Sequence, residues 1–96
     1  MVSLSENITN AGVIAALMRA ETLILFLSSK GIRVKSVSLR HGLPVIRIAR
    51  HAWCEELKKE GRARFDLTGN DRLGRFRQGI YHDESGCRVV WSESIH

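Results

Sequence analysis

Two histidines and two cysteines are the residues of this chain whose types could support metal binding or catalysis. His51 and Cys54 are three residues apart in an expected helix, and a four-residue loop between His82 and Cys87 would place these two opposite each other. Two nitrogen and two sulfur ligands form the set that tetrahedral zinc prefers. The spacing matches no zinc-finger pattern, however, so we expect no metal site and interpret Cys87 as a small apolar residue of the core.

A catalytic cysteine would need a neighbouring base and a third group that orients this base. His51 lies one helical turn from Cys54, but the residues around the pair match no nucleophile signature. The chain also has no nucleophile elbow, phosphate-binding glycine loop, dinucleotide fingerprint or HExxH sequence. We therefore predict a protein that is not an enzyme and that uses no cofactor.

The positive charge of the chain is concentrated in its middle. The formal net charge is +5 overall and +7 within residues 30–65, while the segments before and after are each −1. A concentrated positive field attracts anionic partners, and nucleic acids are the most abundant of these. The side chains that we predict to contact nucleic acid or another partner are Arg33, Lys35, Arg40, Arg47, Arg50, Trp53, Arg62 and Arg64.

A second interpretation of the same charges stays open. A half-buried sheet must turn polar residues outward, and Lys or Arg on an edge strand protects it from aggregation. The aromatic residues do not alternate with the arginines, and no helix-turn-helix or RNA-recognition signature is present. The charge pattern therefore favours an anionic partner without identifying it.

The elements that must position these residues begin with a long helix that ends before Gly31. Apolar residues recur at three- and four-residue steps between residues 13 and 27, which is typical of a helix with one buried face. Ser3 and Glu6 have the spacing of a capping box, and Asn10 is an alternative N-cap. Gly31 is expected to end the helix in a left-handed conformation.

The apolar run of this helix is too short for a membrane span. Residues 13–27 would cover roughly 22 Å as a helix, against about 30 Å of hydrocarbon in a bilayer. Arg19 and Glu21 lie in the middle of the run, and the residues before it include no Lys or Arg, unlike a signal peptide. We predict a cytoplasmic protein without a membrane partner.

Apolar residues of this helix that lie outside the main stripe make a homodimer a further alternative.

Two β-branched runs, residues 32–40 and 43–49, flank His41 and Gly42, which predicts a hairpin with a two-residue turn. Serines and arginines then share the solvent face of the hairpin. Because proline has no N–H to donate, we expect the strand with Pro44 to be an edge strand or to start at a bulge. The predicted cross-strand pairs are Leu39–Pro44, Val37–Ile46 and Lys35–Ile48.

The second half of the chain predicts a short helix within residues 50–61, a strand at 62–68, a loop at 69–74 and a final hairpin. The strands of that hairpin cover residues 75–82 and 87–92, with Cys87, Val89 and Trp91 on one face. The order α-β-β-α-β-β-β indicates a single small α+β domain over residues 1–96. Both helices are expected on one side of an antiparallel or mixed sheet of about four to five strands.

The sequence as a whole favours a binding or regulatory protein. Our leading prediction is contact with nucleic acid or a nucleic-acid-processing complex through residues 30–64. The alternative is a small inhibitor or adaptor that binds a larger acidic protein, since the size, charge and lack of enzyme motifs resemble the accessory proteins of phages and mobile elements. The leading prediction requires the cations of the first hairpin and second helix to share one exposed face.

Overall fold

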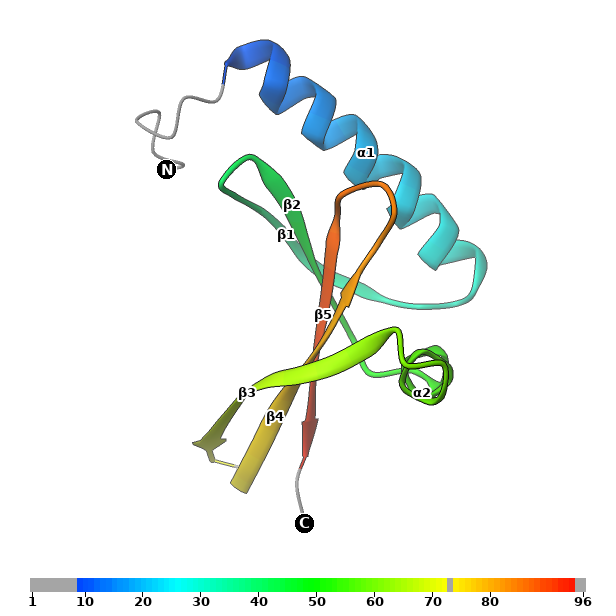
Figure 1. Ribbon diagram of the computed structural model, residues 1–96, viewed down its shortest axis with the longest axis vertical. Helices are drawn as coiled ribbons and strands as arrows, with labels where there is room; N and C mark the ends of the chain where they lie inside the picture. The colour runs from blue at the N-terminus through cyan, green and yellow to red at the C-terminus, as the bar shows by residue number, and fades with distance from the viewer. Residues whose placement is uncertain (1–8, 73, 95–96) are drawn as a thin grey trace.

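The computed structural model describes residues 9–72 and 74–94 of the chain, and these residues form two helices and one mixed sheet of five strands (Figure 1). The strands follow the order β1-β2-β5-β4-β3 across the sheet, and β2 pairs with β5 in parallel while the other neighbours are antiparallel. The predicted α+β class and element order are confirmed. The elements are α1 (Asn10–Ser29), β1 (Val34–Arg40), β2 (Leu43–Ile48), α2 (Ala52–Lys59), β3 (Ala63–Asp71), β4 (Gly74–His82) and β5 (Arg88–Ser94).

One hydrophobic core joins both helices to the same face of the sheet. Alternate residues of a strand point to opposite faces, so a buried face requires apolar residues at every second position. Cys87, Val89 and Trp91 follow this rule and belong to one buried core cluster that does not include Val90, which confirms that they share a face. The larger side chains of this core are Leu23, Leu27, Ile46, Ile48, Trp53, Leu57, Tyr81, Val89 and Trp91.

The start of α1 lies one residue from the alternative N-cap, Asn10, that the sequence predicts. Thr9 is the N-cap, because its hydroxyl oxygen accepts the N–H of Gly12 at 3.0 Å. Asn10 is therefore the first residue of the helix and not its cap. The predicted capping box of Ser3 and Glu6 lies outside the described residues.

Both helices end in a left-handed glycine, as predicted for α1. Gly31 has a φ of +75° and Gly61 has a φ of +71°. The residue after each glycine donates its N–H to the carbonyl five residues earlier, at 3.0 Å in α1 and 2.8 Å in α2. This pairing satisfies carbonyls that the helix end would otherwise leave without partners.

The first hairpin has the predicted two-residue turn, with φ values of +50° at His41 and +78° at Gly42. The two predicted cross-strand pairs nearest the turn are confirmed. The third pair is wrong, because a register shift between Val34 and Ser36 brings Val34 opposite Ile48. Such a bulge changes which residues of the strand meet the partner strand.

The prediction that β2 is an edge strand or starts at a bulge is wrong. β2 lies between β1 and β5, and the register shift in its ladder with β1 is at the Ile48 end, where β2 finishes. The parallel ladder to β5 starts with Val45 opposite Arg88, one residue after Pro44. Pro44 thus precedes the ladder on that side, where the sheet needs no N–H from it.

The two loops of the second half also differ from the prediction. Residues 69–71 continue β3, and Asp71 pairs with Gly74, so the expected loop at 69–74 is much shorter. In the last hairpin, His82 pairs with Arg88 and not with Cys87. His82 therefore lies on the opposite face of the sheet from the buried Cys87.

Candidate functional site

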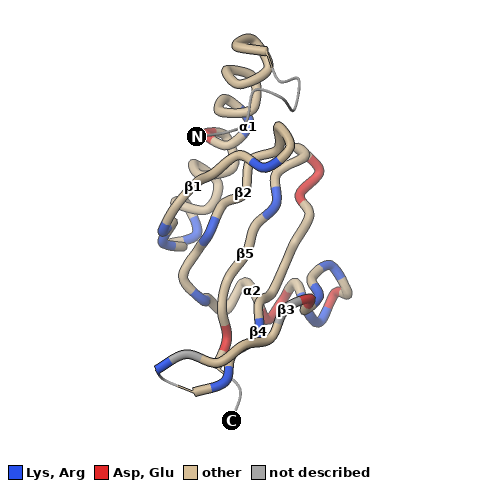
Figure 2. The backbone as a smooth tube through the Cα atoms, turned by 90° about the vertical axis from the view of Figure 1, so that its left-hand side faces the viewer, with Lys and Arg blue, Asp and Glu red and all other residues tan. Residues whose placement is uncertain are grey.

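The face of the sheet that is turned away from the helices carries a hollow of about 310 Å³. Its side chains come from four strands, and we call it the basic hollow. Figure 2 views the molecule from this side and shows Lys and Arg positions on β1, β2 and β5. The lining residues are Ser36, Ser38, Arg40, Val45, Arg47, Gln78, Arg88 and Val90.

Three arginines surround Val45 in the basic hollow. Val45 lies opposite Arg88 of β5 on one side and opposite Ser38 of β1 on the other. Arg47 is two residues further along β2, and Arg40 is two residues from Ser38 along β1. Neighbouring strands are about 4.8 Å apart and alternate residues about 7 Å apart, so the guanidinium groups can reach one small ligand together.

In the part of the chain that the structure describes, the arginines of the basic hollow have no carboxylate partners. Within residues 9–72 and 74–94, no ion pair involves Arg40, Arg47 or Arg88. The Nη2 of Arg47 donates to the Oε1 of Gln78 at 3.2 Å, which orients this guanidinium across β5. A guanidinium carries five N–H donors, so most remain available to an anion.

Arg64 extends the positive charge across the same face. On successive strands, Arg47 lies opposite Val90, Val90 opposite Ile80, and Ile80 opposite Arg64. Three strand spacings separate the two arginines, which corresponds to roughly 14 Å. Arg64 is exposed at β3, which is an edge strand of the sheet. The open face thus offers cations over a distance longer than one phosphate group.

The expected shared face does not include Arg50 and Arg62. Arg50 forms an ion pair with Glu55 at 2.7 Å, and Arg62 forms one with Glu60 at 3.2 Å. Hydrogen bonds from Lys58 and then Arg50 lower the pKa of Glu55, which keeps its carboxylate charged. Neither of these two arginines lines the basic hollow with Arg40 and Arg47, and each is bound by a nearby glutamate.

Three other residues of the predicted contact set also lie apart from the basic hollow. Trp53 packs in the core against Phe26 and Tyr81 on the helix side of the sheet, so its ring does not reach the basic hollow. Arg33 precedes β1, and Lys35 lies at the β1 bulge; both are exposed.

Buried Glu93 pairs with two further cations near α2, Lys58 and Arg77. Its side chain accepts a hydrogen bond from the Nε1 of Trp91 at 2.8 Å. The Nζ of Lys58 lies 3.4 Å away and the Nη2 of Arg77 lies 3.5 Å away. A buried carboxylate requires such partners, so these cations serve the fold on the helix side of the sheet.

Arg88 and Gln78 line the basic hollow but were not predicted as contact residues. The alternation of Cys87, Val89 and Trp91 does place Arg88 outward, and this signal was available in the sequence. Its position beside β2 depends on a parallel pairing between segments more than forty residues apart, which local patterns do not reveal.

His51, Cys54 and Cys87 have structural positions. His51 caps α2, since its Nδ1 accepts the N–H of Trp53 at 3.0 Å. Cys54 and Cys87 are free and buried, and burial raises the pKa of the Cys54 thiol. In the described parts of the chain, no three His, Cys, Asp or Glu side chains are grouped closely enough to hold a metal ion.

The lining of the basic hollow supports binding of an anion by charge and hydrogen bonds. Guanidinium groups pair with phosphate oxygens through two parallel hydrogen bonds, and serine hydroxyls can add further donors. The comparisons with protein-family models, curated proteins and solved structures find no match for this chain.

Proposed function

We propose that this protein is a non-catalytic nucleic-acid-binding protein that contacts the phosphate backbone through the open face of its sheet. The observation that carries this proposal is the set of three arginines around Val45, none of which pairs with a carboxylate in the described residues. Arginines that no carboxylate neutralises are able to replace the counterions of a polyanion.

The extent of the positive face favours a polyanion over a small anion. Arg64 lies roughly 14 Å from Arg47 across the strands, whereas one phosphate group can occupy only the basic hollow. The chain phosphates of nucleic acids repeat at short intervals and can meet both arginines. Among the described ladder positions of this face, the aromatic residue is Phe76, and its ring packs over Gly69. Because this ring contacts the protein itself, we expect the face to bind phosphates and not to stack on bases. Phosphate contacts carry little sequence preference.

The salt dependence of binding tests this proposal. Fluorescence anisotropy of labelled duplex and single-stranded DNA and RNA should show affinity that falls linearly on a log–log plot against salt. Replacing Arg47 or Arg88 with Gln should reduce the slope by about 0.7 to 0.9 for each phosphate that the protein no longer neutralises. The matched controls Arg50→Gln and Arg62→Gln should keep the slope, because glutamates already neutralise these arginines.

Two results would contradict the proposal. One is no measurable binding to any of these nucleic acids at low salt. The other is an equal reduction of slope in the Arg47 and Arg50 variants, which would mean that net charge alone determines binding.

A second candidate function is an adaptor or inhibitor that binds a larger acidic protein. It is favoured by exposed apolar side chains on α1, where Met18 is 63% and Leu25 is 66% exposed. Contiguous apolar patches of this kind are typical of protein interfaces. Arg33 and Lys35 are exposed just beyond α1 and suit an acidic surface. Double substitution of Met18 and Leu25 by Glu should then abolish capture of an acidic partner and leave nucleic-acid binding unchanged.

We further propose that the protein acts in the cytoplasm. The length expected from the sequence is corrected by the structure: α1 has 20 residues, more than the apolar run of residues 13–27, and by length and composition it could cross a membrane. Against this, Ala20, Leu23 and Leu27 of α1 pack in the core of the sheet, and Arg19 and Glu21 are charged at its middle. Fractionation of expressing cells should recover the protein with soluble proteins, and recovery with membranes that resist a salt wash would contradict this.

A further inference from the structure

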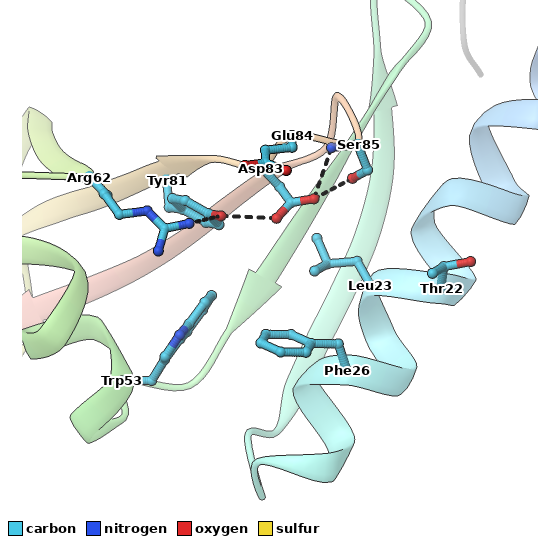
Figure 3. Close-up of a pocket in the computed structure, with 9 residues that line it drawn as sticks. All are labelled: Thr22, Leu23, Phe26, Trp53, Arg62, Tyr81, Asp83, Glu84 and Ser85. Atoms are coloured by element: carbon cyan, nitrogen blue, oxygen red, sulfur yellow. Dashed lines mark hydrogen bonds between the residues drawn. The ribbon is translucent and has the colours of Figure 1, made fainter. Parts of the chain in front are cut away.

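A second cavity, of about 340 Å³, lies on the helix side of the sheet, between α1 and the loop that joins β4 to β5. Figure 3 shows Leu23 and Phe26 of α1 on one side of this space, Trp53 of α2 below it and Asp83 above it. We call it the aromatic pocket. It shares no lining residue with the basic hollow.

Three aromatic rings line the aromatic pocket in different orientations. The ring centres of Phe26 and Trp53 are 6.1 Å apart with planes at 66°, and those of Trp53 and Tyr81 are 5.6 Å apart at 84°. Aromatic faces carry negative electrostatic potential and attract cations. Two rings already contact cations of this chain, since Lys30 lies 5.2 Å from the Phe26 ring centre and Arg62 lies 5.2 Å from that of Tyr81.

The carboxylate of Asp83 supplies negative charge at the pocket. The hydroxyl of Tyr81 donates to its Oδ1 at 3.0 Å, and Ser85 donates to its Oδ2 through the backbone N–H at 3.0 Å and the hydroxyl at 2.5 Å. Burial by itself would raise the pKa of Asp83, but the hydrogen bonds from Ser85 and Tyr81 outweigh it and lower this pKa. Asp83 is therefore ionised at neutral pH.

The same hydrogen bonds limit which cation fits. A carboxylate has about four acceptor positions, and three of those on Asp83 are occupied within the chain. A primary ammonium or a guanidinium brings several N–H donors, and Asp83 has about one acceptor position left to receive them. A methylated ammonium has no such requirement, because it is held by charge and by contact of its methyl groups with aromatic rings.

The charges around the pocket also favour a cation. Arg62 lines it, and its guanidinium is held by Glu60 at 3.2 Å and by the Tyr81 hydroxyl, to which its Nη2 donates at 2.8 Å. Glu84 lies at the pocket, is exposed and has no partner in the described residues. The carboxylates of Asp83 and Glu84 thus exceed the single positive charge among the lining residues.

We propose that the aromatic pocket binds a methylated ammonium group, with Phe26, Trp53 and Tyr81 as its walls and Asp83 as its counter-ion. The site is independent of the nucleic-acid face and lies on the other side of the sheet. The group could belong to a small quaternary ammonium compound or to a trimethylated lysine of another protein, and the chemistry of recognition is the same.

Isothermal titration calorimetry with choline and its uncharged isostere 3,3-dimethylbutan-1-ol tests the proposal. Choline should bind at least about tenfold more tightly, since the two differ in charge and not in shape. A blocked tripeptide with trimethyl-lysine, compared with its unmodified lysine form, identifies the source of the group. Preference for the trimethylated peptide over choline would indicate a protein ligand, and the reverse a small molecule. Equal affinity for choline and the alcohol, or no binding of either ligand or peptide, would overturn the proposal.

Variants separate a cation site from a general apolar cavity. Phe26→Leu keeps an apolar side chain but removes the aromatic face, and should weaken choline binding about tenfold without affecting the alcohol. Asp83→Asn should have a similar effect, and Glu84→Gln, which removes an exposed charge, should have a smaller one. Glu56→Gln on α2 is the matched control outside the pocket and should leave binding unchanged. Circular dichroism confirms that each variant is folded. Unaltered choline binding in the Phe26 and Glu84 variants would overturn the proposal even if the Asp83 variant unfolds.

Discussion

Gly79 lies directly opposite Trp91 in the β4–β5 ladder, and the indole ring of Trp91 occupies the space where a side chain at Gly79 would lie. A Cβ atom at Gly79 would clash with this ring, and Trp91 is fully buried. Because the core cannot move the indole aside, the absence of a side chain at Gly79 is a packing requirement of the fold.

Gly79→Ala should therefore destabilise the protein by about 1 to 3 kcal/mol, the usual cost of overpacking a core. The matched control is Gly69→Ala, where the Cβ would lie 2.9 Å from the Phe76 ring. Phe76 is only half-buried and can shift, so this control should lose less stability. Urea unfolding of both variants measures the difference. Equal stability of the Gly79 variant and the parent would contradict this packing.

Glu93→Ala should destabilise the protein because it removes the carboxylate shared by Lys58, Arg77 and the Trp91 N–H. Loss of one partner from a buried ion pair costs about 3 to 5 kcal/mol, and the partial exposure of the two cations places the expected loss below this range. Glu56→Ala on the exposed side of α2 is the control and should change little. Chemical denaturation at moderate and high salt tests whether the loss persists under screening.

Asp83→Asn should lower stability in a pH-dependent way. Hydrogen bonds in the folded state lower the pKa of Asp83, despite burial, so its ionised form stabilises the folded protein. That contribution is present above the pKa of the unfolded chain and is lost as the pH falls through the lower, folded pKa. The gap between parent and variant should be constant at neutral pH and should close in the acid range. Glu84→Gln in the same loop should show the parental profile, and a gap that widens in acid would contradict the assignment.

Cys54 should react slowly with thiol reagents in the folded protein. It is fully buried, and burial raises its pKa, so little of the reactive thiolate is present near neutral pH. Ellman's reagent should label Cys54 and the equally buried Cys87 only after urea is added. Fast labelling of one thiol in native buffer would show that this part of the core opens readily.

Local features of the fold followed from the sequence because they depend on neighbouring residues. The helix end at Gly31, the hairpin turn at His41 and Gly42 and the inward alternation of Cys87, Val89 and Trp91 all agree with the structure. Each is determined by backbone conformations or side-chain periods that a short segment contains in full.

The tertiary structure alone decided which charges remain available to a partner. The sequence showed an excess of cations in residues 30–65 but not that Glu55 and Glu60 bind Arg50 and Arg62. It also did not place Arg88 beside Val45, since the parallel pairing of β2 with β5 joins segments that are distant along the chain. Charge composition is a property of the sequence, whereas the position of a charge on a surface depends on which strands become neighbours.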